Sequence, residues 1–481
     1  MKKSGVIGLT DIGSRICALR KKSGLTQKEL AKKLNVTLQA VSKWESGISE
    51  PSAEHICSLY RQFGAPLFEQ PEGKPAPPNR NRPYMASIKE LYKIGRGPSS
   101  SHTIGPERAC RIINDRYPDA DRVRVVLFGS LAKTGKGHGT DRVIAETLRA
   151  KQADVVFDHT AEVPHPNTLR FSVYEKGMPV GEHEALSIGG GDIVFDGNLV
   201  NQSKKVYGEN DFSEIKKYCK ANRLSLWEYA EQKEEQLWQF LKTVWEQMVA
   251  SIQNGLEDSG ILPSGLNVHK KAKQLFQSEH MDESPETREN RLICAYAFAV
   301  SEQNASAQTI VTAPTCGAAG VLPAVLYYEQ QKHHYPDEKI YRALATAGII
   351  GNIIKTNASI SGAECGCQAE IGSACAMAAA ALGELFDLNM DKIEYAAEIA
   401  LEHHLGLTCD PVCGLVQIPC IERNAVAAMR AINAVTLANL LWQTRKISFD
   451  NIVKTMKETG NDLRLPYRET AEGGLAKNYH P

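Results

Sequence analysis

Residues 68–83 are the segment that most limits how this chain of 481 residues can fold. Five of these 16 residues are proline. Proline fixes one backbone angle and removes a hydrogen-bond donor, so neither a helix interior nor a central strand fits here. Such a segment is typical of an extended tether between domains. We therefore expect a separate N-terminal domain before it and a larger body after it.

The charge of the chain changes sign across this tether. Residues 1–66 contain 11 lysines and arginines against 5 acidic residues, a net charge of +6. The whole chain has 56 basic and 56 acidic residues, so the remainder carries −6. The neutral total therefore conceals a basic N-terminal domain followed by an acidic body.

Composition and hydropathy place the chain among folded proteins, because hydrophobic residues make up 42% of it. The N-terminus lacks the apolar core of a signal peptide, and no later stretch approaches the roughly 20 apolar residues of a membrane span. We predict a cytoplasmic protein with no membrane partner. Cytosolic thiols stay reduced, so the 12 cysteines are expected to bind metal, to catalyse or to pack in a core.

The basic head contains three short predicted helices, over Ile16–Lys22, Thr26–Leu34 and Thr37–Glu45. The last two form a helix-turn-helix unit whose second helix enters the major groove. The segment from Leu25 to Ser52 resembles the phage-repressor-like (Cro-type, XRE) family. We predict that residues 1–66 bind DNA and, because such domains read DNA as dimers, that the chain forms a homodimer. The candidate DNA-contacting residues are Gln27, Thr37, Gln39, Ser42 and Lys43. The alternative is a small helical bundle whose lysines only keep it soluble.

The body divides into a mixed part and a helical part. Alternating β-branched residues predict strands over Arg122–Phe128 and Thr168–Tyr174, separated by Gly and Pro clusters. Beyond Asn222, apolar residues at three- and four-residue spacing predict helices. These lie within Leu224–Ile252, Arg291–Glu302, Ile340–Lys355, Ile393–His404 and Ala425–Thr444.

Three stretches crowd together polar, small and sulfur-bearing residues: Gly97–Pro106, Thr134–Asp141 and Asn357–Cys420. The glycines and lysine of Thr134–Asp141 are superficially similar to a phosphate-binding loop. However, five residues separate Gly129 from Gly135, and Gly137 follows Lys136 where Ser or Thr is required. An ATP or GTP site is therefore unsupported.

The stretch Asn357–Cys420 holds six cysteines without the paired Cys-x-x-Cys spacing of zinc ribbons. Irregular spacing suits an iron–sulfur cluster, although buried packing explains free cysteines as well. The six are Cys365, Cys367, Cys375, Cys409, Cys413 and Cys420.

Motifs along nearly the whole body resemble the bacterial iron–sulfur L-serine dehydratases. The β region of that family is matched by Gly97–Thr103, Gly129–Leu131, Thr134–His138 and Ser187–Gly191. The α region is matched by Thr312–Thr315, Gly317–Gly320, Asn357–Glu364, Gly366–Gln368, Gly406–Pro411 and Pro419–Ala425.

The resemblance implies a multidomain fold: an all-α helix-turn-helix head, an α/β regulatory-type domain and an all-α catalytic domain. The predicted limits are 1–66 for the head, 67–84 for the linker, 85–225 for the α/β domain and 226–481 for the helical domain. It further implies a [4Fe–4S] cluster on Cys367, Cys409 and Cys420, with one iron open to substrate. The implied reaction converts L-serine to pyruvate and ammonia.

Removing the α-proton of serine requires a base, and histidine suits neutral pH. His102 and His138 are the candidates, each expected in a Gly/Ser/Thr-rich loop, and the sequence leaves open which one acts. Two sets of neighbours are candidate substrate ligands. The first, Ser99, Ser100, Ser101 and Thr103, could instead be turn residues. The second, Asn357, Ser359 and Ser361, could instead cap a helix.

Three cysteines depart from the family pattern, since Cys365 and Cys413 flank the implied ligands and Cys316 stands where Asn or Ala is common. Each could offer an extra thiolate. Two other functions stay open. The chain could be a non-catalytic transcriptional regulator that senses an amino acid or redox state through a dehydratase-like body. It could also be a pyridoxal-phosphate deaminase, for which Lys355 is the passable Schiff-base lysine.

Overall fold

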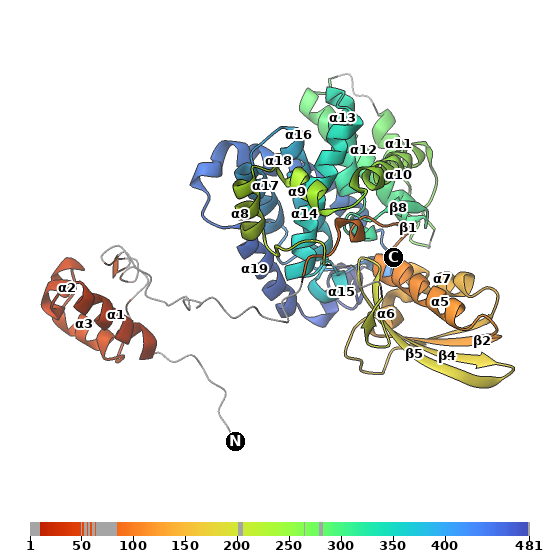
Figure 1. Ribbon diagram of the computed structural model, residues 1–481, viewed down its shortest axis with the longest axis horizontal. Coiled ribbons are helices and arrows are strands. Elements are labelled where there is room, and N and C mark those ends of the chain that lie inside the picture. Colours follow the sequence, from red (N-terminus) through yellow and green to blue (C-terminus); the bar gives the residue numbers. More distant parts are fainter. Residues whose placement is uncertain are drawn as a thin grey trace. The chain divides into compact units, whose positions relative to one another are not determined.

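The computed structural model describes residues 10–49, 51, 55, 58–59, 63, 84–200, 205–263, 265–278 and 282–479. The chain divides into two compact units, Met1–Arg82 and Pro83–Pro481 (Figure 1). The predicted linker 67–84 lies outside the described residues except for Tyr84.

The first unit contains the three predicted helices, α1 (Thr10–Lys22), α2 (Gln27–Lys33) and α3 (Leu38–Glu45). Thr26 caps α2 in a capping box with Glu29, so local sequence fixes where this helix begins. The core of the unit consists of Ile16, Leu30, Ala31, Leu34, Val41, Trp44 and Leu59. The helix-turn-helix prediction is confirmed.

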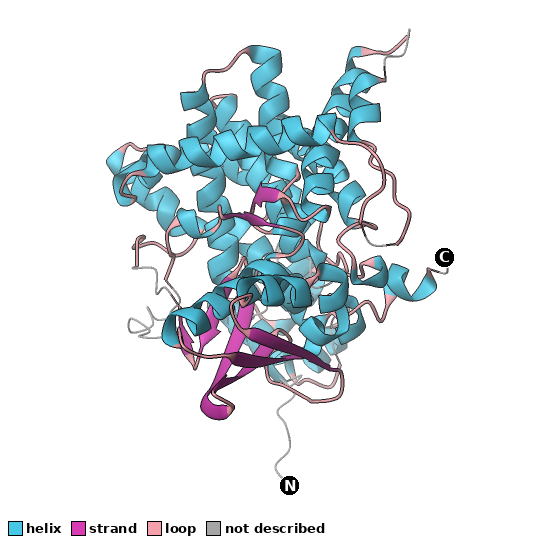
Figure 2. Cartoon of the chain, turned by 90° about the vertical axis from the view of Figure 1, so that its right-hand side faces the viewer, coloured by secondary structure: helices cyan, strands magenta, loops and turns pink. Residues whose placement is uncertain are grey.

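One end of the second unit is a six-stranded sheet covered by helices (Figure 2). The strand order is β3 (Gln152–Asp158), β2 (Arg122–Phe128), β4 (Thr168–Glu175), β5 (Met178–Gly189), β6 (Asp192–Phe195) and β7 (Asn198–Leu199). Strand β2 pairs with β3 in parallel and with β4 antiparallel, and the pairs from β4 to β7 are antiparallel. Helices α5 (Gly105–Arg116), α6 (Gly129–His138) and α7 (Thr140–Thr147) pack against it. Both predicted strands are confirmed.

Alternation decides which face of this sheet is buried. In β2, Val123, Val125 and Leu127 are fully buried, whereas Arg122 and Arg124, which alternate with them, are exposed. The buried side chains form a core that is separate from the core of the helical part.

The rest of the second unit is helical. Its longer helices are α8 (Phe212–Asn222), α9 (Leu226–Lys233), α10 (Leu237–Glu257), α12 (Pro285–Ala305), α13 (Val321–His333), α14 (Asp337–Asn357), α16 (Ser373–Leu385), α17 (Met390–Glu402), α18 (Cys420–Leu441) and α19 (Phe449–Asp462). The shorter ones are α11 (Ala272–Gln277), α15 (Gly362–Cys365) and α20 (Gly474–Asn478). A small antiparallel pair, β1 (Ile94–Arg96) and β8 (Thr309–Val311), joins residues from both parts of the body. These elements confirm the predicted fold class.

The alanine-rich α16 lies at the centre of the helical core. It contacts α13, α14, α17 and α18, and nearly all of its side chains are buried. Small alanine side chains allow helix backbones to approach closely. The same core also includes Ile88 and Leu91 near the start of the unit, and Phe212 and Ile215 of α8.

One helix among the described residues is long and apolar enough to cross a membrane by length and composition. This stretch, Cys420–Thr444, has a mean hydropathy of 1.3 and is only 39% buried. It packs against α12, α16 and α17. Its solvent-facing side chains include Val426, Leu437, Leu440 and Leu441.

Candidate active site

His102 lies in a turn of π-helix, Ser100–Ile104, that leads into α5. The Ser99 hydroxyl accepts a hydrogen bond from the His102 backbone N–H and so caps this turn. Ser99, Ser100, Ser101, His102 and Thr103 are all buried. The Thr103 hydroxyl donates to the Arg96 and Ser99 carbonyls, so this side chain stabilises the turn itself.

His138 is the last residue of helix α6. The expectation that both histidines lie in loops is therefore wrong. The glycines near His138 suggest a loop in the sequence, but in the structure two of them mark the ends of a helix. At the start, Gly129 has φ +57°, and a Cβ there would lie 2.4 Å from the Pro166 carbonyl oxygen. At the end, Gly139 has φ +71° and forms the left-handed C-cap.

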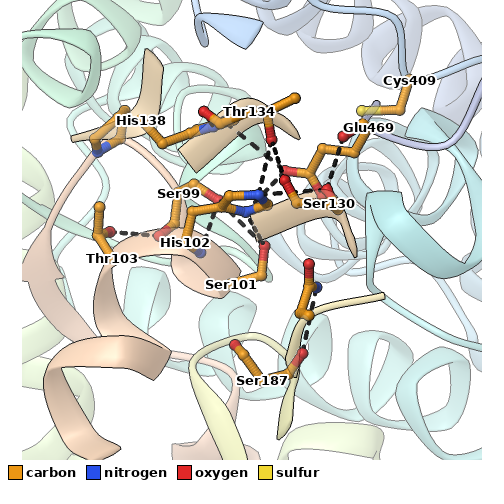
Figure 3. Close-up of polar contacts among 12 residues, drawn as sticks. Ser99, Ser101, His102, Thr103, Ser130, Thr134, His138, Ser187, Cys409 and Glu469 are labelled. Carbon is orange, nitrogen blue, oxygen red and sulfur yellow. Dashed lines mark hydrogen bonds and ion pairs between the residues drawn. The ribbon is translucent and has the colours of Figure 1, made fainter. Parts of the chain in front are cut away.

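The two imidazoles stack with their ring centroids 4.3 Å apart, deep inside the body (Figure 3). Near His102 Nδ1 lie the Ser101 hydroxyl at 3.0 Å and the Ser99 hydroxyl at 3.3 Å. Near its Nε2 lie the Thr134 hydroxyl at 2.9 Å and the Ser130 hydroxyl at 3.4 Å.

His138 makes fewer contacts. Its Nδ1 donates to the Thr134 carbonyl oxygen at 2.9 Å. Its Nε2 is buried and has no hydrogen-bond partner among the described residues. Burial lowers the pKa of His138 to about 4. Burial and the neighbouring imidazole also lower the pKa of His102, so both rings are neutral at pH 7.

Glu469 is a site residue that sequence reasoning missed. Its carboxylate oxygen Oε1 lies 3.4 Å from His102 Nδ1 and 3.8 Å from His138 Nε2. Burial raises the pKa of Glu469 well above its ordinary value. Only an irregular segment with Pro466, Gly473 and Gly474 surrounds it in the sequence, which signals a loop but not its partner.

The three implied cluster ligands come from three separate elements. Cys367 precedes another turn of π-helix, Gln368–Gly372, Cys409 pairs as an isolated bridge with Arg468, and Cys420 is the first residue of α18. The Cys409 thiol donates to Cys367, and this bond, together with the Arg423 guanidinium, lowers the pKa of Cys367. Burial and the charge of Cys367 raise the pKa of Cys420.

Arg423 and Glu370 complete this sulfur side, and neither was singled out from the sequence. Arg423 donates to the Thr408 carbonyl and lies 3.2 Å from Asp410. Burial opposes its charge, but the three cysteines and Asp410 raise the pKa of Arg423. Burial raises the pKa of Glu370 to about 6, and Thr315 donates to this carboxylate at 2.8 Å.

The three thiols fit an iron–sulfur cluster better than a single ion. Ligands around one zinc ion, at about 2.3 Å, would hold their sulfurs roughly 4 Å apart. Within the described part of the chain, the sulfurs of Cys367, Cys409 and Cys420 do not all lie within 4.8 Å of one another. Cys367 and Cys409 are buried and Cys420 is half-buried. Three thiols from separate elements, with an arginine to offset their charge, have the donor chemistry of a cluster.

The histidine side and the sulfur side meet at the C-terminal segment. The Ser130 hydroxyl donates to the Glu469 carbonyl oxygen at 2.7 Å. The Glu469 N–H donates to the Cys409 carbonyl oxygen at 2.8 Å. Two polar networks from different parts of the body are thereby fixed to the same residue.

The second set of candidate substrate ligands differs in whether its polar groups already have partners. Asn357 donates to the carbonyls of Asn210 and Ile353, and the Ser359 hydroxyl donates to Glu364, so both have structural partners. The Ser361 hydroxyl is buried and finds no partner in the described ranges, so it keeps its hydrogen-bonding capacity.

The other candidate thiols and Lys355 have local explanations. The Cys365 thiol faces Gly460 of α19, where an added Cβ would lie 2.6 Å from the sulfur. Cys316 is buried and Cys413 is exposed. The Lys355 amine forms an ion pair with Asp192 at 2.5 Å. A pyridoxal-phosphate mechanism would need this amine to form a Schiff base.

A cavity of 430 Å³ reaches His138 from the surface. Its lining includes Lys136, Arg142 and the pair of Arg96 with Glu146 at 3.1 Å, a net positive charge that favours an anionic group such as an amino-acid carboxylate. Cys413 also lines it.

Comparison with known proteins gives the class of this molecule. The family model for the serine dehydratase alpha chain matches residues 144–476, and that for the beta chain matches residues 87–156. A helix-turn-helix model matches residues 18–70. The chain belongs to the serine dehydratase family of lyases, as its motifs predicted, and carries a helix-turn-helix head.

Individual relatives agree with this assignment. The L-serine dehydratase of Streptomyces coelicolor is 39% identical over 449 residues, covering 82% of this chain and 98% of the relative. L-serine dehydratase 2 of Escherichia coli is 38% identical over 448 residues, with the same coverage of both chains. The L-serine dehydratase of Haemophilus influenzae is 38% identical over 449 residues, covering 82% of this chain and 99% of the relative.

Proposed function

We propose that the chain is an L-serine ammonia-lyase that converts L-serine to pyruvate and ammonia and holds a [4Fe–4S] cluster on Cys367, Cys409 and Cys420. The observation that carries this proposal is the position of Glu469: its carboxylate lies 3.4 Å from His102 Nδ1 and 3.8 Å from His138 Nε2, and its backbone is hydrogen-bonded to Cys409. When bound, the cluster supplies a Lewis-acidic iron for the substrate's hydroxyl and carboxylate.

The chain's own residues supply the proton chemistry. A neutral imidazole takes the α-proton, the C–O bond to the β-hydroxyl breaks, and that oxygen leaves as water after gaining a proton. The aminoacrylate that forms tautomerises to an imine, which water hydrolyses to pyruvate and ammonia. The free Ser361 hydroxyl and the hydroxyls of Ser99, Ser100 and Ser101 are the polar groups that we assign to substrate orientation.

The experiment is an anaerobic assay of pyruvate release from L-serine, combined with iron and sulfide analysis, on the wild type and Cys367→Ala. We expect the wild type to be active with about four irons per chain and the variant to lose both. A wild type with an intact cluster and no turnover on serine, threonine or cysteine would favour the amino-acid- or redox-sensing regulator instead.

We further propose that residues 1–66 bind DNA through α3. Thr37, Gln39, Ser42 and Lys43 are exposed at this helix, as base and phosphate contacts require. Gln27 is half-buried and donates to Glu45 of α3, so we assign it a supporting role beside this helix. The affinity of the full chain for DNA should fall steeply as salt rises, because phosphate contacts release counterions.

A homodimer in the cytoplasm completes the proposal. One DNA-reading helix per chain calls for a second copy, and the exposed apolar side chains of α18 offer a surface for it. Leu440→Glu should convert the dimer to a monomer in light scattering, whereas Met178→Glu, at an exposed position on β5, should not. A wild type that is already monomeric would contradict this.

The domain limits 1–66, 67–84, 85–225 and 226–481 remain a proposal. Ile88 near the start of the α/β segment, and α8 at its end, pack in the helical core. Limited proteolysis of the full chain should therefore cut in the linker well before it cuts near residue 225.

A further inference from the structure

Cys413 is the only fully exposed cysteine among the residues that the structure describes, since the others are buried or half-buried. It lies in the middle of a single turn of 3-10 helix, η5 (Val412–Gly414), whose two other residues are buried. The φ angle of Cys413 is +53°, in the left-handed region that favours glycine. Neither packing nor backbone geometry therefore accounts for a cysteine at this position.

The turn η5 is held firmly against the C-terminal end of helix α6. Within the turn, the Gly414 N–H donates to the Pro411 carbonyl oxygen at 3.0 Å. A Cβ at Gly137 of α6 would lie 2.8 Å from the Cys413 carbonyl oxygen, and a Cβ at Gly414 would lie 3.0 Å from that of Thr134. Because the two elements approach this closely, the Cys413 thiol is fixed beside the end of α6.

Cys413 and His138 line the same cavity of 430 Å³. His138 is 2% exposed, and its Nε2 has no hydrogen-bond partner among the described residues. A buried polar atom without a partner, at the wall of a cavity, indicates that a ligand enters this cavity. Since Cys413 is exposed and His138 is buried, the thiol lies nearer to the mouth. A group bonded to Cys413 would therefore stand in the path to His138.

The charge of the cavity lining selects which small molecules reach this thiol. Its described lining residues include three basic side chains, Arg96, Lys136 and Arg142, and one acidic side chain, Glu146. Arg96 and Glu146 pair at 3.1 Å, so two positive charges are left over. A cleft lined by one sign of charge raises the local concentration of molecules of the opposite sign. The cavity therefore favours reagents that carry carboxylates.

We propose that Cys413 is a modification site that forms a mixed disulfide with a small, carboxylate-bearing disulfide, and that the adduct closes the cavity to substrate. The Cys413 sulfur attacks one sulfur of the reagent, whose S–S bond breaks while the new S–S bond forms. The other half of the reagent leaves as a thiol and takes up the proton that Cys413 loses. The small disulfide is thus the only oxidant that the step needs. The modification stands by itself, whereas the loss of serine turnover rests on the proposed function.

Peptide mapping by mass spectrometry tests the site and its selectivity on the anaerobically prepared full enzyme. The probes are oxidised glutathione, which carries carboxylates, and cystamine, whose only charged groups are amines. Each rate is divided by the rate of the same probe with the uncharged thiol 2-mercaptoethanol. We expect oxidised glutathione to modify Cys413 at least about tenfold faster than cystamine on this scale at low salt, with the ratio falling as salt rises. Equal rates at low salt, or adducts on other cysteines but not on Cys413, would overturn the proposal.

Anaerobic pyruvate release from L-serine tests the closure of the cavity. Wild type modified at Cys413 should lose at least about tenfold of its rate, keep its iron and recover when dithiothreitol removes the adduct. The same treatment should leave Cys413→Gly and Cys413→Ser within about twofold of their own untreated rates, because neither variant has a thiol here. Glycine also suits the left-handed backbone, so Cys413→Gly should fold as the wild type does.

Cys294→Ser is the matched control, because Cys294 is half-buried outside this cavity and its thiol contacts the sulfur of Met429. It should lose activity on treatment as the wild type does. Equal losses in the wild type and Cys413→Gly, or a loss of iron in step with the rate, would overturn the closure. A chain that forms the adduct at Cys413 but releases no pyruvate before treatment would instead overturn the proposed function, and the mapping would still decide the site.

Discussion

The two sides of the active site are built in different ways. On the histidine side, η2 (Ser100–Ile104) and α6 place hydroxyls and a carbonyl around the rings, and every ring nitrogen except His138 Nε2 has such a neighbour among the described residues. On the sulfur side, Cys367, Cys409 and Cys420 come from separate elements, and their main partners are one another and Arg423. The histidine side is ordered mainly by hydrogen bonds from neighbouring hydroxyls and carbonyls, whereas the sulfur side rests on interactions among the thiols and with one arginine.

The largest expected effect follows from removing a sulfur. Cys367→Ala, Cys409→Ala and Cys420→Ala should each lower kcat by at least about 10³-fold, because the metal's stabilisation of the leaving group is worth several kcal/mol. Pyruvate release and iron content, measured anaerobically, check this. Cys365→Ala is the control, since its thiol faces Gly460, and it should keep both. Loss of the cluster in Cys365→Ala alone would show that the sulfur side has been assigned wrongly.

A smaller effect is expected on the histidine side. Thr134→Val removes the hydroxyl that lies 2.9 Å from His102 Nε2 and leaves the Ser130 hydroxyl at 3.4 Å. We expect kcat to fall about tenfold with the iron content unchanged, because one buried hydrogen bond is worth roughly 1 kcal/mol or somewhat more. Thr140→Val is matched to it, since the buried Thr140 hydroxyl lacks a partner among the described residues. Equal losses in both variants would mean that side-chain shape matters here, and not the bond to His102.

The sequence predicted the parts of the fold that depend on local chemistry. The alternation in Arg122–Phe128 and the start of the second helix at Thr26 depend on neighbours in the chain, and the structure confirms both. Spacing alone left the cysteines undecided between a cluster and packing. Glu469 was missed because its partner His102 is more than 360 residues away, and only the folded chain brings them together.

The contact that fastens the sheet to the helical core should affect stability more than catalysis. Asp192 of β6 pairs with Lys93 and with Lys355 of α14. Burial opposes its charge, but these lysines lower the pKa of Asp192 from 3.8 to about 2. Asp192→Asn should therefore cost about 2 kcal/mol of the free energy of unfolding at pH 7, with kcat changed only a few-fold.

The pH dependence of this loss has a definite sign. A carboxylate whose folded pKa is depressed stabilises the fold above its unfolded value, and that stability is lost as pH falls through the folded value. The difference between wild type and Asp192→Asn should be full above about pH 4 and shrink toward pH 2. Thermal unfolding at several pH values measures it. A difference that stays constant over this range would show that Asp192 acts through packing.

The smallest effect on catalysis is expected from removing the head. The chain divides at Arg82, and the head core around Trp44 shares no residue with the two cores of the body. A chain of residues 83–481 should keep kcat within about twofold and keep its iron, while losing its salt-dependent affinity for DNA. Steady-state kinetics and a DNA-binding titration at two salt concentrations compare it with the full chain. If kcat fell tenfold with the iron retained, the head would act on the histidine side; if iron were lost, it would act on the sulfur side.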